Sequence, residues 1–139
     1  MRIMGLDVGE RRIGVAISDP GGVLASPLEA IEREGEDRDV KRVLELMQKH
    51  DVRCVVVGIP FSMSGTMGQQ AKRADAFRRV LTSVSKMRVV GWDERLSTVE
   101  AERRLRQVGV DPSLERGRTD AASAAIILQS YLDSQRRKK

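Results

Sequence analysis

Three acidic residues, distant from one another in the sequence, occupy positions where a carboxylate could take part in chemistry. Asp7 interrupts an apolar segment between Gly5 and Gly9, where a carboxylate without a partner is costly to bury. Glu94 directly follows another short apolar segment, and Asp120 stands in the first turn of a predicted helix. Each has an ordinary alternative role: a hydrogen bond to a turn for Asp7, a surface ion pair for Glu94, and a helix-dipole contact for Asp120.

The three carboxylates point to a metal site if the fold brings them together. Like charges at close range repel one another unless a cation lies between them. Carboxylate oxygens suit Mg²⁺ or Mn²⁺, ions that also bind substrate phosphates. Small residues follow Asp120 (Ala121, Ala122, Ala124 and Ala125) and would let its helix pack closely on a sheet. We therefore expect Asp7, Glu94 and Asp120 to share a divalent metal site.

The elements that must position these acids follow from the hydrophobic pattern. The sequence predicts strands over 3–8, 13–18, 23–31, 54–60 and 88–92, and helices that include 37–47, 71–81, 101–108 and 119–131. A short polar connection that begins at Gly9 joins the first two strands, which indicates a β-hairpin. The order β-β-β-α-β-α-β-α-α predicts an α/β fold: a mixed five-stranded sheet, with its first three strands antiparallel and helices on both faces.

Sites in open α/β sheets lie beyond the carboxyl ends of the strands, near the point where the strand order reverses. This rule selects Asp7, the Ile59-Pro60 pair and the Asp93-Glu94 pair. Two of the three candidate acids are therefore expected at the same edge of the sheet.

Length and composition restrict the remaining possibilities. The chain of 139 residues is 40% hydrophobic and 32% charged, which predicts one domain over 1–134 and a basic, disordered tail over 135–139. Its one cysteine and one histidine exclude an internal disulfide and a Cys/His zinc site. The apolar runs are far shorter than the ~20 residues of a membrane span, and the first residues do not resemble a signal peptide. We expect a cytoplasmic protein that does not contact a membrane.

The net charge of +5 leaves the nature of the partner open. Four of these charges come from residues 136–139, so the rest of the chain carries only +1. Residues 71–88 nevertheless hold six basic residues against Asp75 alone. Such asymmetry permits a basic face for phosphates, although an ordinary solvated helix face explains it equally well.

Four sequence blocks, in order and across nearly the whole chain, resemble the YqgF/RuvX family. The first block is Gly5-Leu6-Asp7-Val8-Gly9 with Arg12-Ile13-Gly14-Val15-Ala16 and Ser18-Asp19, and the second is Val57-Gly58-Ile59-Pro60 with Met63, Gly65-Thr66 and Gly68. The third is Asp93-Glu94-Arg95-Leu96-Ser97-Thr98, and the fourth is Asp120-Ala121-Ala122-Ser123-Ala124-Ala125 with Ile127-Leu128-Gln129-Ser130-Tyr131-Leu132. The loop of the second block departs from the family pattern at Ser62, Ser64, Met67 and Gln69, where the family commonly has Asn, Asp, Glu and a nearby Pro.

The resemblance implies an RNase H-like fold related to Holliday-junction resolvases. It also implies a nuclease of ribosome biogenesis that hydrolyses phosphodiester bonds at the 5′ end of precursor 16S rRNA. On this interpretation Asp7, Glu94 and Asp120 are both metal ligands and catalytic residues, Asp7 bridges two ions, and the cofactor is Mg²⁺ or Mn²⁺. The substrate and partner is then nucleic acid, with RNA favoured.

Arg12, Arg95 and Thr98 are the predicted nucleic-acid contacts. Guanidinium groups match phosphate oxygens in geometry and charge. The alternative for Arg12 and Arg95 is a surface ion pair, with Glu10 or with Asp93. For Thr98, a helix cap is the alternative.

Other functions remain open from the sequence. An actin-like phosphotransferase or ATPase also carries Asp-x-Gly in its first strand and turn, but its site closes between two lobes and this chain is long enough for one. A non-catalytic nucleic-acid-binding module would gain nothing from three carboxylates that face an anionic ligand. A junction resolvase requires a two-fold symmetric dimer; a homodimer is possible, and the sequence does not establish one.

Overall fold

The computed structural model describes residues 1–62, 64–96, 99–109 and 119–137. The strands are β1 (Arg2–Val8), β2 (Arg12–Ser18), β3 (Ala25–Glu32), β4 (Val52–Ile59) and β5 (Arg88–Asp93). The helices are α1 (Glu36–Lys49), α2 (Gln69–Ser85), α3 (Val99–Gln107) and α4 (Thr119–Arg137), and a 3₁₀ turn, η1 (Glu94–Leu96), follows β5. The predicted order of elements is confirmed.

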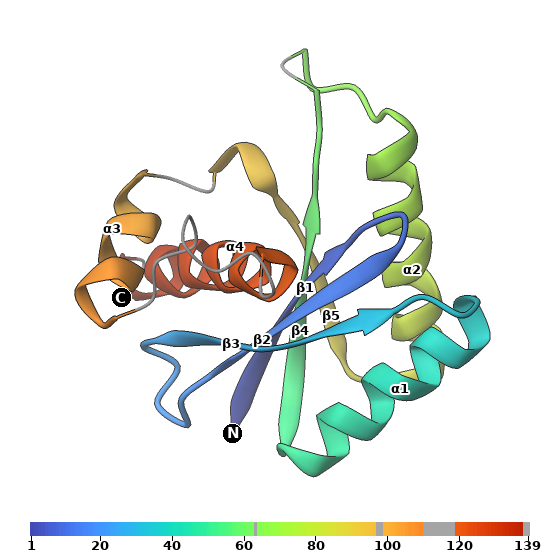
Figure 1. Ribbon diagram of the computed structural model, residues 1–139, viewed down its shortest axis with the longest axis horizontal. Helices are drawn as coiled ribbons and strands as arrows, with labels where there is room; N and C mark the ends of the chain where they lie inside the picture. The colour runs from blue at the N-terminus through green and yellow to red at the C-terminus, as the bar shows by residue number, and fades with distance from the viewer. Residues whose placement is uncertain (63, 97–98, 110–118, 138–139) are drawn as a thin grey trace.

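The five strands form one mixed sheet in the order β3-β2-β1-β4-β5 (Figure 1). The pairs β1–β2 and β2–β3 are antiparallel, whereas β4 is parallel to both β1 and β5. The central strand β1 therefore lies where the antiparallel and parallel parts of the sheet meet. The prediction of three antiparallel strands followed by helical crossovers is confirmed.

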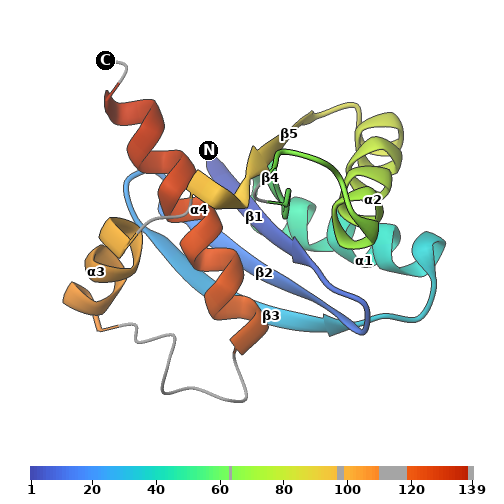
Figure 2. The ribbon, with the colours of Figure 1, turned by 90° about the horizontal axis from the view of Figure 1, so that it is seen from above.

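Helices cover both faces of the sheet, as Figure 2 shows: α1 and α2 lie on one side, and α3 and α4 on the other. Side chains of β1 alternate between the two faces. Met4, Leu6 and Val8 belong to the core under α1 and α2. Gly5 faces α4, because a side chain there would meet Leu128. The same alternation directs Asp7 to the α4 side of the sheet.

Helix α4 crosses the sheet at very close range because glycines lie beneath it. A Cβ atom on Gly5 would lie 2.7 Å from Cβ of Leu128, and one on Gly58 would lie 2.6 Å from Cδ1 of Ile127. A Cβ atom on Gly14 would collide with the backbone carbonyl of Asp120. Since Gly14 pairs with Asp7 across the β1–β2 ladder, this contact brings the first turn of α4 beside Asp7.

Several boundaries differ from those predicted. Strand β3 begins at Ala25 and not at 23, because Oδ1 of Asp19 accepts hydrogen bonds from the backbone N–H groups of Val23 and Leu24 and holds them in the turn. Helix α4 continues to Arg137, so three residues of the expected tail are helical, and residues 138–139 lie outside the described part. Within the described ranges, no helix has the length and apolar character needed to cross a membrane.

The close approach of α4 yields a stability prediction. Replacing Gly14 with Ala should lower the free energy of unfolding by roughly 1–3 kcal/mol, because the new methyl group meets backbone atoms of α4 that cannot rotate away. Chemical denaturation followed by circular dichroism measures this change. Gly68→Ala is the matched control, since a Cβ atom there meets nothing within 4 Å and its φ of −79° suits alanine. Equal midpoints for the two variants would contradict the proposed role of Gly14.

Candidate active site

Asp7 is a half-buried carboxylate near the carboxyl end of the central strand. Burial, and secondarily the negative charge of Asp120, raise the pKa of Asp7 to about 6. No donor among the described residues forms a hydrogen bond or ion pair with this carboxylate. Its charge is therefore uncompensated at neutral pH, as the sequence position suggested.

Glu94 lies at the start of η1, directly after β5, and reaches back over the neighbouring strand β4. A Cβ atom on Gly58 of β4 would lie 2.8 Å from its Oε1 atom, so the glycine makes room for the carboxylate. Burial raises the pKa of Glu94 to about 7, with smaller contributions from the charges of Asp7 and Asp93. Like Asp7, it has no hydrogen-bond donor to its carboxylate in the part of the chain that is described.

Asp120, in the first turn of α4, lies over β2, whereas Glu94 lies over β4 on the other side of Asp7. Its Oδ2 atom accepts a hydrogen bond of 2.7 Å from Nε of Arg12. The same guanidinium group lies 3.6 Å, through Nη1, from Oε1 of Glu32. Asp120 thus has a cationic partner, whereas Asp7 and Glu94 have none among the described residues.

The structure places Glu94 and Asp120 close enough to Asp7 that each of them interacts electrostatically with it. The structure does not arrange the three acids as a finished coordination shell: over the described ranges, no three His, Cys, Asp or Glu side chains lie close enough together to hold one metal ion. The donor set nevertheless fits a hard divalent cation, because it offers only carboxylate oxygens and two of the carboxylates are half-buried without counter-charge.

Of the predicted nucleic-acid contacts, Arg95 lies on the Glu94 side of the site. Its Nη2 atom lies 2.7 Å from Oδ2 of Asp93, so the ion pair weighed as an alternative is present. Arg95 also donates to the carbonyl of Ser62 at 3.3 Å and packs over the ring of Phe61 at 5.6 Å. Arg95 therefore ties the loop after β4 to the end of β5.

Arg12 forms an ion pair as well, with Asp120 and Glu32 and not with Glu10. Thr98 lies outside the described residues. In the loop after β4, the hydroxyl groups of Ser62, Ser64 and Thr66 lie within hydrogen-bond distance of one another, at 2.7 to 3.2 Å.

Two residues near the site were missed by sequence reasoning. Glu32 lies opposite Arg12 in the β2–β3 ladder, which no local motif reveals. Arg33 donates to the carbonyl of Gly9 at 3.2 Å and to the buried carboxylate of Asp39 at 3.0 Å, and so fixes the hairpin turn beside the site. A charged residue directly after a strand was the only available signal, and it is too common to be diagnostic.

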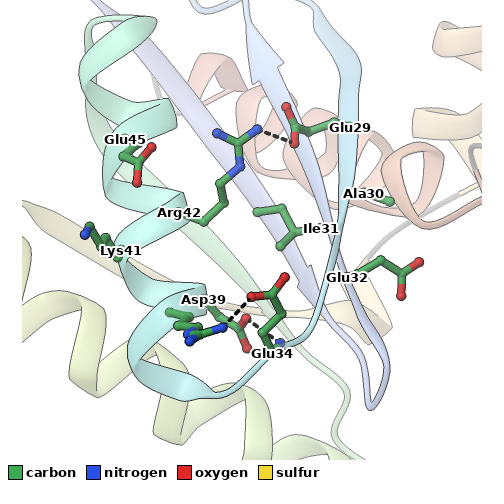
Figure 3. Close-up of a pocket in the computed structure, with 10 residues that line it drawn as sticks. Glu29, Ala30, Ile31, Glu32, Glu34, Asp39, Lys41, Arg42 and Glu45 are labelled. Atoms are coloured by element: carbon green, nitrogen blue, oxygen red, sulfur yellow. Dashed lines mark hydrogen bonds and ion pairs between the residues drawn. The ribbon is translucent and has the colours of Figure 1, made fainter.

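A cavity of about 510 Å³ between β3 and α1 is a separate feature (Figure 3). Ion pairs cross it, from Arg42 to Glu29 at 3.1 Å and from Arg38 to Glu34 at 3.2 Å. It contains none of the three candidate acids, and its two arginines, Arg38 and Arg42, are paired with carboxylates of its own lining. We do not assign it to the site.

The mixed five-stranded sheet with helices on both faces is an RNase H-like fold, and solved structures of Holliday-junction resolvases share it with this chain. The Thermus thermophilus RuvC in complex with Holliday junction substrate matches with a TM-score of 0.67 and 18% identity, over 98% of this chain and 96% of that one. The fowlpox virus Holliday junction resolvase matches with a TM-score of 0.58 and 12% identity, over 96% and 99%.

The sequence comparison is more specific. The model of the family described as "RuvX: Holliday junction resolvase" matches residues 1–134, and the chain belongs to this family. A protein of Roseiflexus sp. (strain RS-1) is 45% identical over 97% of this chain and 96% of its own length. A Caldanaerobacter subterraneus subsp. tengcongensis protein is 46% identical over 98% and 99%. Both are named "Putative pre-16S rRNA nuclease".

The raised pKa of Asp7 predicts how stability depends on pH without metal. Between about pH 4 and pH 6 the folded protein retains a proton that the unfolded chain has lost, so this carboxyl group lowers stability progressively as pH rises through that window. Asp7→Asn should therefore stabilise the protein at pH 8 by at most about 3 kcal/mol and change little at pH 4. Denaturation in EDTA at both pH values measures this difference. Glu10→Gln, at an exposed turn position, is the control, and a stability gain for Asp7→Asn that is the same at both pH values would contradict the prediction.

Proposed function

We propose that this chain is a metal-dependent nuclease that hydrolyses phosphodiester bonds at the edge of the sheet marked by Asp7. The observation that carries the proposal is a pair of half-buried carboxylates, Asp7 and Glu94, without cationic partners among the described residues and with Asp120 beside them. A binding module for an anionic polymer would be weakened by such a cluster. A hydrolase that recruits a cation gains from it.

Asp7, Glu94 and Asp120 are the proposed metal ligands and catalytic residues. A bound Mg²⁺ or Mn²⁺ would neutralise charge on the phosphate and activate a water molecule. Asp7 would hold the centre of the site because it comes from the middle strand, and Glu94 and Asp120 would contribute from either side. Burial of Asp7 and Glu94 keeps their oxygens poorly solvated, so a cation that replaces the missing solvent is bound more strongly.

Arg12 and Arg95 are the proposed phosphate contacts, together with Thr98. The two arginine side chains are 48% and 39% exposed, so each guanidinium group can face solvent while it retains an internal carboxylate partner. They lie on the Asp120 side and the Glu94 side of the acids, respectively. A polyanion that crosses the edge of the sheet would then be contacted on both sides of the scissile bond.

The proposed substrate is the 5′ region of precursor 16S rRNA, and the support is the name given to relatives 45–46% identical over nearly the whole chain. This role in ribosome biogenesis would be carried out in the cytoplasm. The proposed catalytic domain is residues 1–134, the range that matches the family.

Cleavage of a 5′-labelled precursor 16S rRNA fragment with Mn²⁺ or Mg²⁺ tests the proposal. Asp7→Asn should lower the rate roughly 100-fold or more, because loss of metal-based charge stabilisation is worth several kcal/mol, while Glu10→Gln should cleave like the wild type. Equal rates for wild type and Asp7→Asn would indicate a contaminating nuclease. RNA binding without cleavage would favour a non-catalytic module.

Metal binding has its own readout in thermal stability. The wild type should gain about 2–3 kcal/mol of stability when the Mn²⁺ concentration is about 100 times its Kd, and Asp7→Asn should gain much less. Calorimetric unfolding with and without Mn²⁺ measures both gains. A wild-type melting temperature that does not respond to Mn²⁺ would argue against the site.

A second candidate function is resolution of Holliday junctions, favoured by the family description and by the fold shared with two resolvases. It would require a homodimer with two active sites related by two-fold symmetry. The same assay with a four-way DNA junction separates the candidates. Paired symmetrical nicks, together with a dimer in sedimentation experiments, would favour the resolvase.

A further inference from the structure

Arg12 lies between two carboxylates that come from different elements. Across the β2–β3 ladder it pairs directly with Glu32, and across the helix–sheet contact it donates to Asp120. Ile31 belongs to the core under α1, so alternation along β3 turns Glu32 to the α4 side. Figure 3 likewise shows Glu32 directed away from Arg42 and Glu45.

The two contacts of Arg12 differ in length and in the atoms they use. Its Nε atom lies 2.7 Å from Oδ2 of Asp120, whereas its Nη1 atom lies 3.6 Å from Oε1 of Glu32. The guanidinium group thus favours Asp120 but already lies within reach of Glu32. A rotation of the Arg12 side chain would exchange the stronger partner for the weaker one.

This exchange of partners requires only side-chain rotation, because the backbone at this point is held by close packing. The carbonyl of Asp120 lies directly on Gly14, so the first turn of α4 cannot approach the sheet further. Arg12 and Glu32 are 48% and 73% exposed, and exposed side chains change rotamer at low cost. Exposed ion pairs are also weak, so the Arg12–Asp120 contact can be displaced by a competing cation.

We propose that Arg12 serves as the resident counter-ion of Asp120 and that Glu32 is a positioning residue that holds Arg12 aside when a divalent cation binds. This inference rests on the proposed function, because it assumes that Asp120 is a metal ligand. It accounts for the lack of a ready three-carboxylate cluster over the described ranges, since Asp120 is engaged by Arg12. When it is displaced towards Glu32, the guanidinium group of Arg12 stays at the edge of the site, where it can contact a substrate phosphate.

The first test is the affinity of the full-length protein for Mn²⁺ alone, measured from the electron paramagnetic resonance signal of the free ion. Arg12→Gln should tighten binding roughly two- to fivefold, the range expected for removal of one exposed ion pair. Arg11→Gln is the matched control: it removes an equal charge from the neighbouring exposed position and should change the affinity less. Weaker binding by Arg12→Gln, or tightening no greater than that of Arg11→Gln, would overturn the proposal.

The second test isolates Glu32 with a double-mutant cycle. Glu32→Gln should weaken Mn²⁺ binding roughly twofold in the wild-type background, because Arg12 then loses its alternative partner. In the Arg12→Gln background the same substitution should have no effect. An equal loss in both backgrounds would mean that Glu32 acts only through its charge, and would overturn its role as a positioning residue.

The outcomes also distinguish failure of this inference from failure of the proposed metal-dependent function. Absence of Mn²⁺ binding in the wild type and every variant, with unchanged circular dichroism spectra, would overturn both the metal site and the proposed exchange of Arg12 between Asp120 and Glu32. Binding by the wild type that Asp7→Asn abolishes, with no difference between Arg12→Gln and Arg11→Gln, would overturn only the exchange.

Discussion

The contact between α4 and bare backbone of the sheet is the constraint on which the site depends. A helix packed on a sheet is normally held off by the side chains between them, but here Gly5, Gly14 and Gly58 remove those side chains along its path. The result is an Asp120 backbone that lies on β2, one strand away from Asp7. The same absence of side chains at Gly58 gives Glu94 its place over β4. The glycines thus allow close packing of α4 on the sheet, and this packing brings the acids together.

The electrostatic character of the site follows from that packing. Asp7 and Glu94 are partly buried in the folded chain, and their pKa values rise because burial disfavours the charged form. Asp120, nearer the solvent, is matched by Arg12. The three acids therefore carry a negative charge that Arg12 only partly neutralises. That imbalance lowers the stability of the metal-free protein at neutral pH and favours the binding of a cation that can reach the carboxylate oxygens.

The sequence was sufficient for the parts of this arrangement that depend on local patterns. Alternation and turn chemistry predicted the hairpin and the mixed sheet, and a charged residue inside an apolar strand marked Asp7. What it could not supply were the partners of exposed charges. Arg12 is closer in sequence to Glu10 than to Asp120 or Glu32, and only the strand register and the helix crossing decide between them. Nor could the sequence show that Gly5 makes room for Leu128 of α4.

Helix α4 is also fixed at a second point, far from the acids. The side chain of Gln129 is fully buried and bridges to the turn before β3: it accepts from the N–H of Ala25 and donates to the carbonyl of Val23, each at 2.9 Å. The number of residues between Asp120 and Gln129 is consequently fixed, because each of these side chains must meet its own partner on the sheet. One inserted or deleted residue between them would turn one end by about 100° relative to the other, so Asp120 and Gln129 could no longer both face the sheet. The contacts at its two ends therefore fix the number of residues in this stretch of α4.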